Sequence, residues 1–194
     1  MEHMSTKETI IATGARIMLE KGYNNTGLQE VLKEARVPNG SFYHYFGSKE
    51  DFGLAVTDRY AQESNDFLAF HLDNHELPPL DRLRGFFEAA TKRYDAEGCW
   101  GGCLMGNFGQ ELSDQNPVFR DCVATMLDDW RVRFAKCLKE AVVQGELRED
   151  IDPDALANFA LDSWEGAILR MKVTKTVHPL ERFIHFIFGT VITA

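Results

Sequence analysis

Apolar residues recur along the whole chain at intervals of three and four, which is the spacing of amphipathic helices. In the first such stretch, Ile10, Ile17 and Met18 share one stripe, and the residues from Ser5 to Glu8 resemble a capping box. No window shows the two-residue alternation of β-branched residues that is typical of a strand. The pattern therefore predicts an all-α fold of about nine helices.

The N-terminal part is predicted to contain three short helices and the start of a fourth. The expected ranges are 5–20, 28–35, 41–46 and from Ser48 onward, with Ser48 as the cap of the fourth helix. Pro38 and Gly40 interrupt the chain between the second and third helices. Three short helices with a tight turn before the third are typical of a helix-turn-helix, whose third helix enters the major groove of DNA.

Longer helices are predicted for the remainder, which should form an antiparallel helical bundle. Their expected ranges are 80–95, 105–113, 117–144, 153–172 and 179–193. We accordingly expect a DNA-binding domain over residues 5–51 and a second, helical domain over residues 52–194. The last helix is apolar on more than one face, so it favours a subunit interface formed by the helices at 153–172 and 179–193.

Charge limits how this chain can touch DNA. The 194 residues carry 21 Lys and Arg against 30 Asp and Glu, a formal net charge of −9. A uniformly basic surface is therefore excluded, and any contact with DNA must be local. Residues 1–53 have six basic and seven acidic side chains, so most of the acidity lies in the remainder of the chain.

Candidate DNA contacts lie on and around the third helix. Its hydroxyl and imidazole groups can bond phosphates and base edges, and Gly40 permits a close approach of the backbone. Lys49 adds a charged phosphate contact, and exposed backbone N–H groups near Thr26 and Gly27 add neutral ones. The candidates at the third helix are Asn39, Gly40, Ser41, Tyr43, His44 and Tyr45. We expect Phe42 and Phe46 to pack inward instead.

The segment from Val37 to Glu50, above all Gly40-Ser41-Phe42-Tyr43-His44-Tyr45-Phe46 followed by Ser48-Lys49-Glu50, resembles the TetR family of bacterial transcriptional repressors. The stretch from Gly22 to Thr26 and the helix over 28–35 match as well. This resemblance implies a homodimer that binds a palindromic double-stranded operator and a C-terminal bundle whose last two helices dimerise. Ligand binding to that bundle would release the operator. Asn39 departs from the family pattern, because close relatives often have a lysine there.

Two of the four cysteines, Cys99 and Cys103, lie in a glycine-rich stretch next to a predicted helix start, where a thiolate is favoured. Gly102-Cys103-Leu104, the segment from Trp164 to Lys172 and the segment from Pro179 to Glu181 resemble the branch of TetR regulators typified by the N-ethylmaleimide reductase repressor. That resemblance implies a reactive cysteine and a nearby lysine, at Cys103 and Lys172, that sense electrophiles. An ammonium near Cys103 would stabilise its thiolate.

Other interpretations of the second half stay open. The effector can be a non-covalent apolar molecule, with Trp100, Trp130 and Trp164 among its candidate contacts, or Cys103 can be purely structural. A cysteine-dependent enzyme is a weaker alternative, since no catalytic signature accompanies the thiols. We expect neither enzymatic activity nor a cofactor or metal, because the cysteine spacing does not match a zinc site. No stretch is long and apolar enough for a membrane span, so the sequence favours a cytoplasmic protein.

Overall fold

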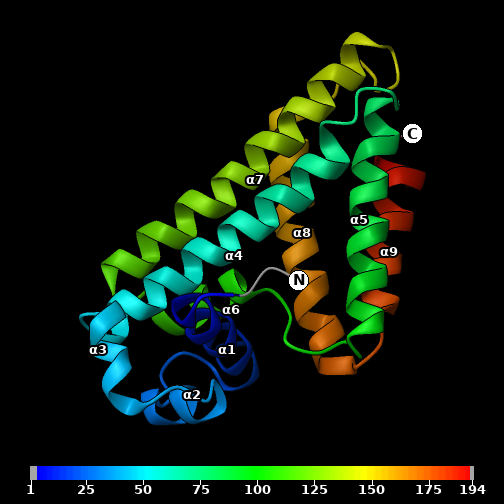
Figure 1. The fold of residues 1–194 in the computed structure, drawn as a ribbon. Coiled ribbons are helices and arrows are strands. Elements are labelled where there is room, and N and C mark those ends of the chain that lie inside the picture. Colours follow the sequence, from blue (N-terminus) through cyan, green and yellow to red (C-terminus); the bar gives the residue numbers. More distant parts are fainter. Residues whose placement is uncertain (1–3, 193–194) are drawn as a thin grey trace. The chain divides into compact units, whose positions relative to one another are not determined.

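The computed structural model describes residues 4–192. Within this range the chain forms nine α-helices and no β-strand, which confirms the predicted fold class (Figure 1). The described residues divide into two compact units: one runs up to Glu63 and includes Leu104–Val123, and the other comprises Ser64–Cys103 and the chain from Ala124 onward. The boundary predicted between residues 51 and 52 falls within a helix, and it stays a prediction.

The first unit holds the short helices. These are α1 (Thr6–Lys21), α2 (Leu28–Glu34), a 3-10 turn (Asn39–Ser41), α3 (Phe42–Tyr45), the first part of α4 (Lys49–Leu72), α6 (Leu104–Leu112) and the start of α7 (Pro117–Val143). The capping box is confirmed: the Glu8 N–H donates to Ser5 Oγ, and the Ser5 N–H donates to Glu8 Oε2. Ser48 also caps α4, because its Oγ accepts from the Asp51 N–H at 3.0 Å.

The second unit contains the rest of α4 and of α7, with α5, α8 and α9. The remaining bounds are α5 (Pro79–Ala96), α8 (Pro153–Thr174), α9 (His178–Phe186) and a π-helical turn (Ile187–Val191). The predicted helix over 179–193 therefore changes its hydrogen-bond pattern after Phe186, and its residue 193 lies outside the described range. Helix α9 packs against both α5 and α8 (Figure 1).

The absence of a side chain at Gly14 leaves space on α1 that the core of the first unit fills. Gly14 faces the ring of Phe52, and a Cβ at this position would collide with the end of that ring. Phe52 in turn packs against Phe42 and Phe46, with ring centroids 5.6 and 5.1 Å away. All three phenylalanines are buried. The missing side chain of Gly14 thus lets α4 reach α1 while it supports the short α3.

A carboxylate from α6 holds the turn between α1 and α2. Glu111 accepts hydrogen bonds from the backbone N–H groups of Tyr23 at 2.8 Å and Asn24 at 2.7 Å. Gly22 ends α1 with φ of +86°, and Glu111 Oε2 lies 2.6 Å from the place where its Cβ would be. A glycine is needed here for both its backbone conformation and its small volume.

Removing this carboxylate should destabilise the first unit. Glu111→Ala leaves two backbone N–H groups without their charged acceptor, and we expect a loss of about 1–2 kcal/mol in the free energy of unfolding. Urea unfolding followed by circular dichroism measures this loss. Asp114→Ala, which removes an exposed carboxylate two residues beyond the end of α6, is the matched control. Equal stability of the two variants would contradict the role of Glu111.

Candidate nucleic-acid interface and sensor site

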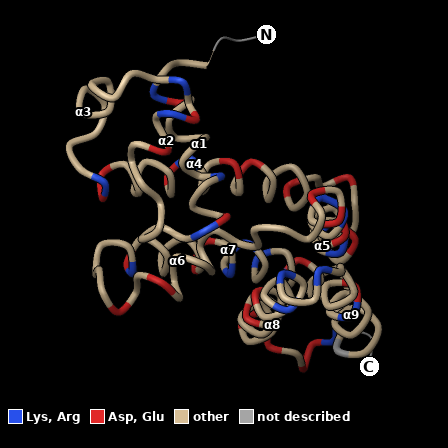
Figure 2. The backbone as a smooth tube through the Cα atoms, turned by 90° about the horizontal axis from the view of Figure 1, so that it is seen from below, with Lys and Arg blue, Asp and Glu red and all other residues tan. Residues whose placement is uncertain are grey.

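The short helix α3 separates its side chains into an inner and an outer set. Phe42 and Phe46 are buried, which confirms that they pack inward. Tyr43 is 73% exposed, His44 is also exposed and Tyr45 is half-buried. In Figure 2 the α3 segment carries no Lys, Arg, Asp or Glu. Its outer face therefore offers hydroxyl and imidazole groups, which can bond phosphates or base edges.

The turn before α3 leaves its backbone accessible. Asn39 and Gly40 are exposed, and Ser41 is half-buried. A Cβ added at Gly40, or at Gly27 before α2, would meet no atom within 4 Å. Neither glycine is thus required by packing within this chain, whereas a close approach to an outside molecule would be eased by both.

The structure corrects the expectation for Thr26. Its side chain is only 1% exposed, and its hydroxyl donates to the carbonyl of Gly22 at 2.6 Å. Its backbone N–H is also engaged, since it donates to the carbonyl of Tyr23 at 3.1 Å. Thr26 closes the turn between α1 and α2 and does not present the exposed N–H group that the sequence predicts there. The exposed Gly27 directly follows it and precedes the first turn of α2.

Lys49 has a role inside the protein as well. Its Nζ donates to the carbonyl of Asn24 at 3.1 Å and lies 4.7 Å from the centre of the Tyr23 ring. Burial lowers the pKa of Lys49, partly offset by the negative charge of Glu111. An ammonium has three N–H donors, so the predicted phosphate contact requires a donor that the Asn24 carbonyl does not use.

Several cations of the first unit are neutralised by neighbouring carboxylates. Arg16 pairs with Glu20 and Glu34, and Lys21 pairs with Glu30. Lys33 and Arg36, around the end of α2, have no ion-pair partner within residues 4–192. Lys7, whose Nζ lies 5.7 Å from the centre of the Phe46 ring, likewise has no ion-pair partner within residues 4–192, and none of these three cations was among the predicted DNA contacts.

Two of the predicted sensor residues, Cys103 and Lys172, lie at the same loop of the second unit. Cys103 directly precedes α6 and is 3% exposed. Lys172, on α8, lies beside the same loop: its Cδ is 3.5 Å from the position a Cβ would take on Gly102. The structure therefore brings the stem of Lys172 to the residue before Cys103.

A carboxylate that the sequence did not identify lies at Cys103. The Cys103 thiol hydrogen-bonds to the side chain of Glu165 on α8. Burial raises the pKa of Glu165 to about 7, although this hydrogen bond acts in the opposite direction. Burial also raises the pKa of Tyr94 well above its ordinary value, with further contributions from Cys103 and Glu165. The sequence held one signal for this carboxylate: Glu165 lies seven residues before Lys172, so the two side chains share a face of α8.

The three tryptophans do not form one cluster. Trp164 is buried in an aromatic core, with its ring 4.8 Å from that of Phe87 and 5.3 Å from that of Phe183. Trp130 is largely buried, and its indole N–H has no hydrogen-bond partner in the described part of the chain. Trp100 is partly exposed, next to Cys99. The roles of all three in effector binding stay predictions.

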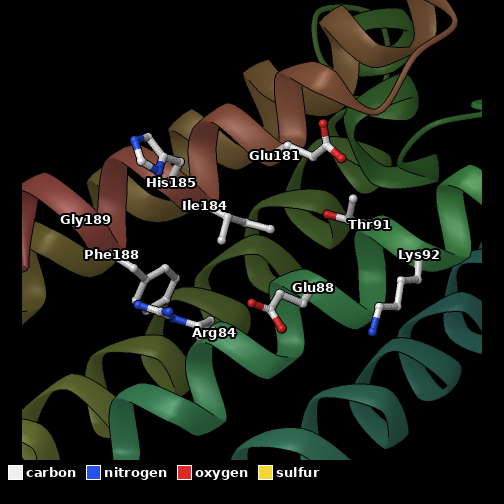
Figure 3. Close-up of a pocket in the computed structure, with 9 residues that line it drawn as sticks. All are labelled: Arg84, Glu88, Thr91, Lys92, Glu181, Ile184, His185, Phe188 and Gly189. Carbon is white, nitrogen blue, oxygen red and sulfur yellow. The ribbon is translucent and has the colours of Figure 1, made fainter.

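A surface pocket of about 460 Å³ lies between α5 and α9 (Figure 3). Arg84 covers the Phe188 ring at 5.0 Å on one side of it, and Glu88, Lys92 and Glu181 add exposed charges. None of the predicted sensor residues lines this pocket. It is therefore separate from the environment of Cys103.

Three short N-terminal helices, the third of which presents an exposed outer face, are joined to a larger helical bundle, and this arrangement defines a DNA-binding regulator of the helix-turn-helix class. The chain belongs to the TetR family. The family model described as bacterial regulatory proteins, tetR family, matches residues 10–56, and the tetracyclin repressor-like C-terminal domain matches residues 79–187. Within residues 4–192, no helix has the length and apolar character that a membrane crossing needs.

Three relatives extend the comparison over nearly the whole chain. The repressor DhaR of a Mycobacterium species is 35% identical, covering 97% of this chain and 93% of its own. The regulator AcuR of Cereibacter sphaeroides is 42% identical, covering 94% and 86%. The repressor NemR of Escherichia coli is 30% identical over 99% and 96%, and the crystal structure of its reduced form has a TM-score of 0.86, covering 95% of this chain and 96% of that one. This chain is accordingly a TetR-family transcriptional repressor.

The four thiols should differ in reactivity, and Cys137 should be among the slowest. Its thiol is buried, donates to the Pro79 carbonyl at 3.0 Å, and has a pKa raised by burial to about 11. Compared with a pKa of 9.0, this lowers the thiolate fraction at pH 8 about a hundredfold, so alkylation should be slower than in unfolded protein by at least that factor.

Peptide mass spectrometry after timed iodoacetamide treatment measures the rate for each cysteine, with urea-unfolded protein as the control. Because Cys137 stays protonated below about pH 11, its rate should still rise tenfold per pH unit between pH 7 and 9. A rate that levels off within this range would contradict the expected protonation state.

Proposed function

We propose that this repressor acts as a homodimer on a palindromic operator and leaves it when a small molecule or an electrophile acts on the second unit. The reader comprises the outer face of α3 with the turn before it, assisted by Gly27 and Lys49. Cys103 is the reactive thiol of the sensor, with Lys172 beside it. As a bacterial transcription regulator, the protein acts in the cytoplasm.

The exposure of Tyr43 and His44 is the observation that carries the DNA-binding part of the proposal. Tyr43 is 73% exposed on a helix that Phe42 and Phe46 anchor, so its ring is available to a partner and is not part of the hydrophobic core. Such a helix, supported from behind and polar in front, fits the major groove. The acidic balance of the chain restricts the contact to this region.

The dimer is proposed to form through the helices predicted at 153–172 and 179–193. In the structure, α8 and α9 frame an apolar surface hollow of about 380 Å³. Phe159 and Phe186, at its edge, are 46% and 52% exposed. A second copy would bury both rings, as expected for an isologous interface formed by the same surface on two subunits.

The sensor proposal rests on the environment of Cys103. Its thiol lies between a loop rich in glycine and α8, which supplies both Glu165 and Lys172. The relative NemR has been crystallised in a form named as reduced. We extend the same chemical sensitivity to Cys103, whose thiolate can add to quinones, aldehydes or acrylates, or be oxidised.

A non-covalent apolar effector is the second candidate. The enclosed indole N–H of Trp130 favours it, because a buried donor without a partner is costly unless a ligand or water accepts its hydrogen bond. In that case the cysteines are structural. An enzyme is not favoured, since the relatives are named as transcriptional regulators.

Truncating the exposed tyrosine of α3 tests the reader. Tyr43→Ala should weaken binding about tenfold or more, because a lost phosphate or base contact costs about 1–3 kcal/mol. The probe is a palindromic duplex that the wild-type protein selects from random DNA, followed by fluorescence anisotropy. Phe70→Ala removes a similarly exposed aromatic residue in the second unit and serves as the control. Unchanged affinity in Tyr43→Ala would refute the placement of the reader.

Replacing the proposed reactive thiol tests the sensor. Cys103→Ser should bind the same duplex as tightly as wild type and should no longer release it after N-ethylmaleimide treatment, because the hydroxyl is a poor nucleophile at neutral pH. Cys122→Ser, which alters a half-buried thiol, should still release the duplex. Full release by Cys103→Ser would favour a non-covalent effector or another thiol.

A further inference from the structure

Glu165 places a carboxylate against the thiol of Cys103. The carboxylate accepts a hydrogen bond from that thiol, so the pair already has the geometry that a proton transfer needs. Its Oε1 is enclosed by protein and has no hydrogen-bond partner within the described residues. A buried acceptor without a partner costs free energy, and packing alone gives no reason to retain it.

The surroundings restrict which group can take the proton. Tyr94, from α5, faces the pair and keeps its own proton, since burial and its neighbours raise its pKa. Lys172, from α8, has its stem beside Gly102, and its ammonium is a donor that cannot accept a proton. Of these three described neighbours of Cys103, the Glu165 carboxylate is therefore the one that can act as a base near neutral pH.

We propose that Glu165 is the proton acceptor for Cys103 when this thiol attacks an α,β-unsaturated carbonyl compound. This inference rests on the electrophile sensing proposed above and names the group that activates the thiol. The stem of Lys172 lies beside Gly102 in the same loop, with its Cδ 3.5 Å from the position a Cβ would take there.

The addition of Cys103 to the electrophile is balanced in atoms and charge, because the proton that the thiol gives up is returned to the product. The S–H proton of Cys103 passes to the Glu165 carboxylate, and the thiolate forms a carbon–sulfur bond with the β-carbon of the electrophile. The carbon–carbon π bond breaks, and its electron pair produces an enolate. The enolate carbon takes the proton back from the Glu165 carboxylic acid. The product is a thioether, and the carboxylate is regenerated without an oxidant or reductant.

Glu165→Gln tests the inference, because glutamine keeps the shape of the side chain and cannot act as a base. N-Ethylmaleimide is the probe, and peptide mass spectrometry of the full-length protein measures the alkylation rate of Cys103 from pH 5.5 to 8.5. The wild-type rate should rise and then level off above about pH 7, where Glu165 is ionised. The variant should react at least tenfold more slowly at pH 7 and should rise tenfold per pH unit without levelling.

Asp162→Asn, an exposed change on the same helix, is the matched control and should react as wild type does. Folding is checked independently: burial penalises the charged form of Glu165, so Glu165→Gln should be at least as stable as wild type at pH 8. An equal rate and profile in Glu165→Gln, a faster reaction, or no reaction of Cys103 in wild type would each overturn the inference.

Measurements of operator binding distinguish a failure of this inference from a failure of the proposed function. If Cys103 alkylation depends on Glu165 but leaves the selected duplex bound, electrophile sensing fails while the proton transfer stands. If alkylation releases the duplex equally fast in wild type and Glu165→Gln, sensing stands and the role of Glu165 is refuted.

Discussion

The contact between the Phe52 ring and the bare backbone of Gly14 is the constraint on which the reader depends. Helix α3 has only four residues, far too few to be stable alone, so its conformation must come from packing. Phe42 and Phe46 anchor its inner side, and both rest on Phe52. Because the inner side is secured in this way, the outer side is free to carry Tyr43 and His44.

Acidic residues contribute to the stability of this reader, although their charge has the same sign as that of DNA. Glu111 binds two backbone N–H groups of the turn before α2, and Glu30 and Glu34 neutralise cations of α1. The negative charge of the first unit is thus largely engaged in holding helices together. The α3 segment itself has no Lys, Arg, Asp or Glu, so we expect recognition there to rely on hydrogen bonds and shape.

Local signals predicted the helices well, whereas the site needed the tertiary structure. Ser5, Gly22 and Ser48 mark helix ends through contacts with near neighbours, so their effects are visible in the sequence. The contacts of Glu111 with Tyr23 and Asn24 join residues 88 and 87 positions apart, and no motif links them. Thr26 differs from its prediction for a similar reason. A threonine before a helix is typically exposed, but here the turn between α1 and α2 encloses its side chain.

The same limit explains why the sequence indicated Lys172 near Cys103 but not the carboxylate of Glu165, which lies there as well. A resemblance to a family indicates which residue types to expect, whereas tertiary packing decides where each side chain on α8 points. Two adjacent anions in an enclosed site would repel each other, so we expect the pair of Cys103 and Glu165 to carry at most one negative charge near neutral pH. The thiol hydrogen bond lowers the pKa of Glu165, so its loss on alkylation removes that stabilisation of the carboxylate. The adduct therefore holds a carboxyl group that binds protons more tightly than before, and covalent modification is converted into an electrostatic change within the bundle.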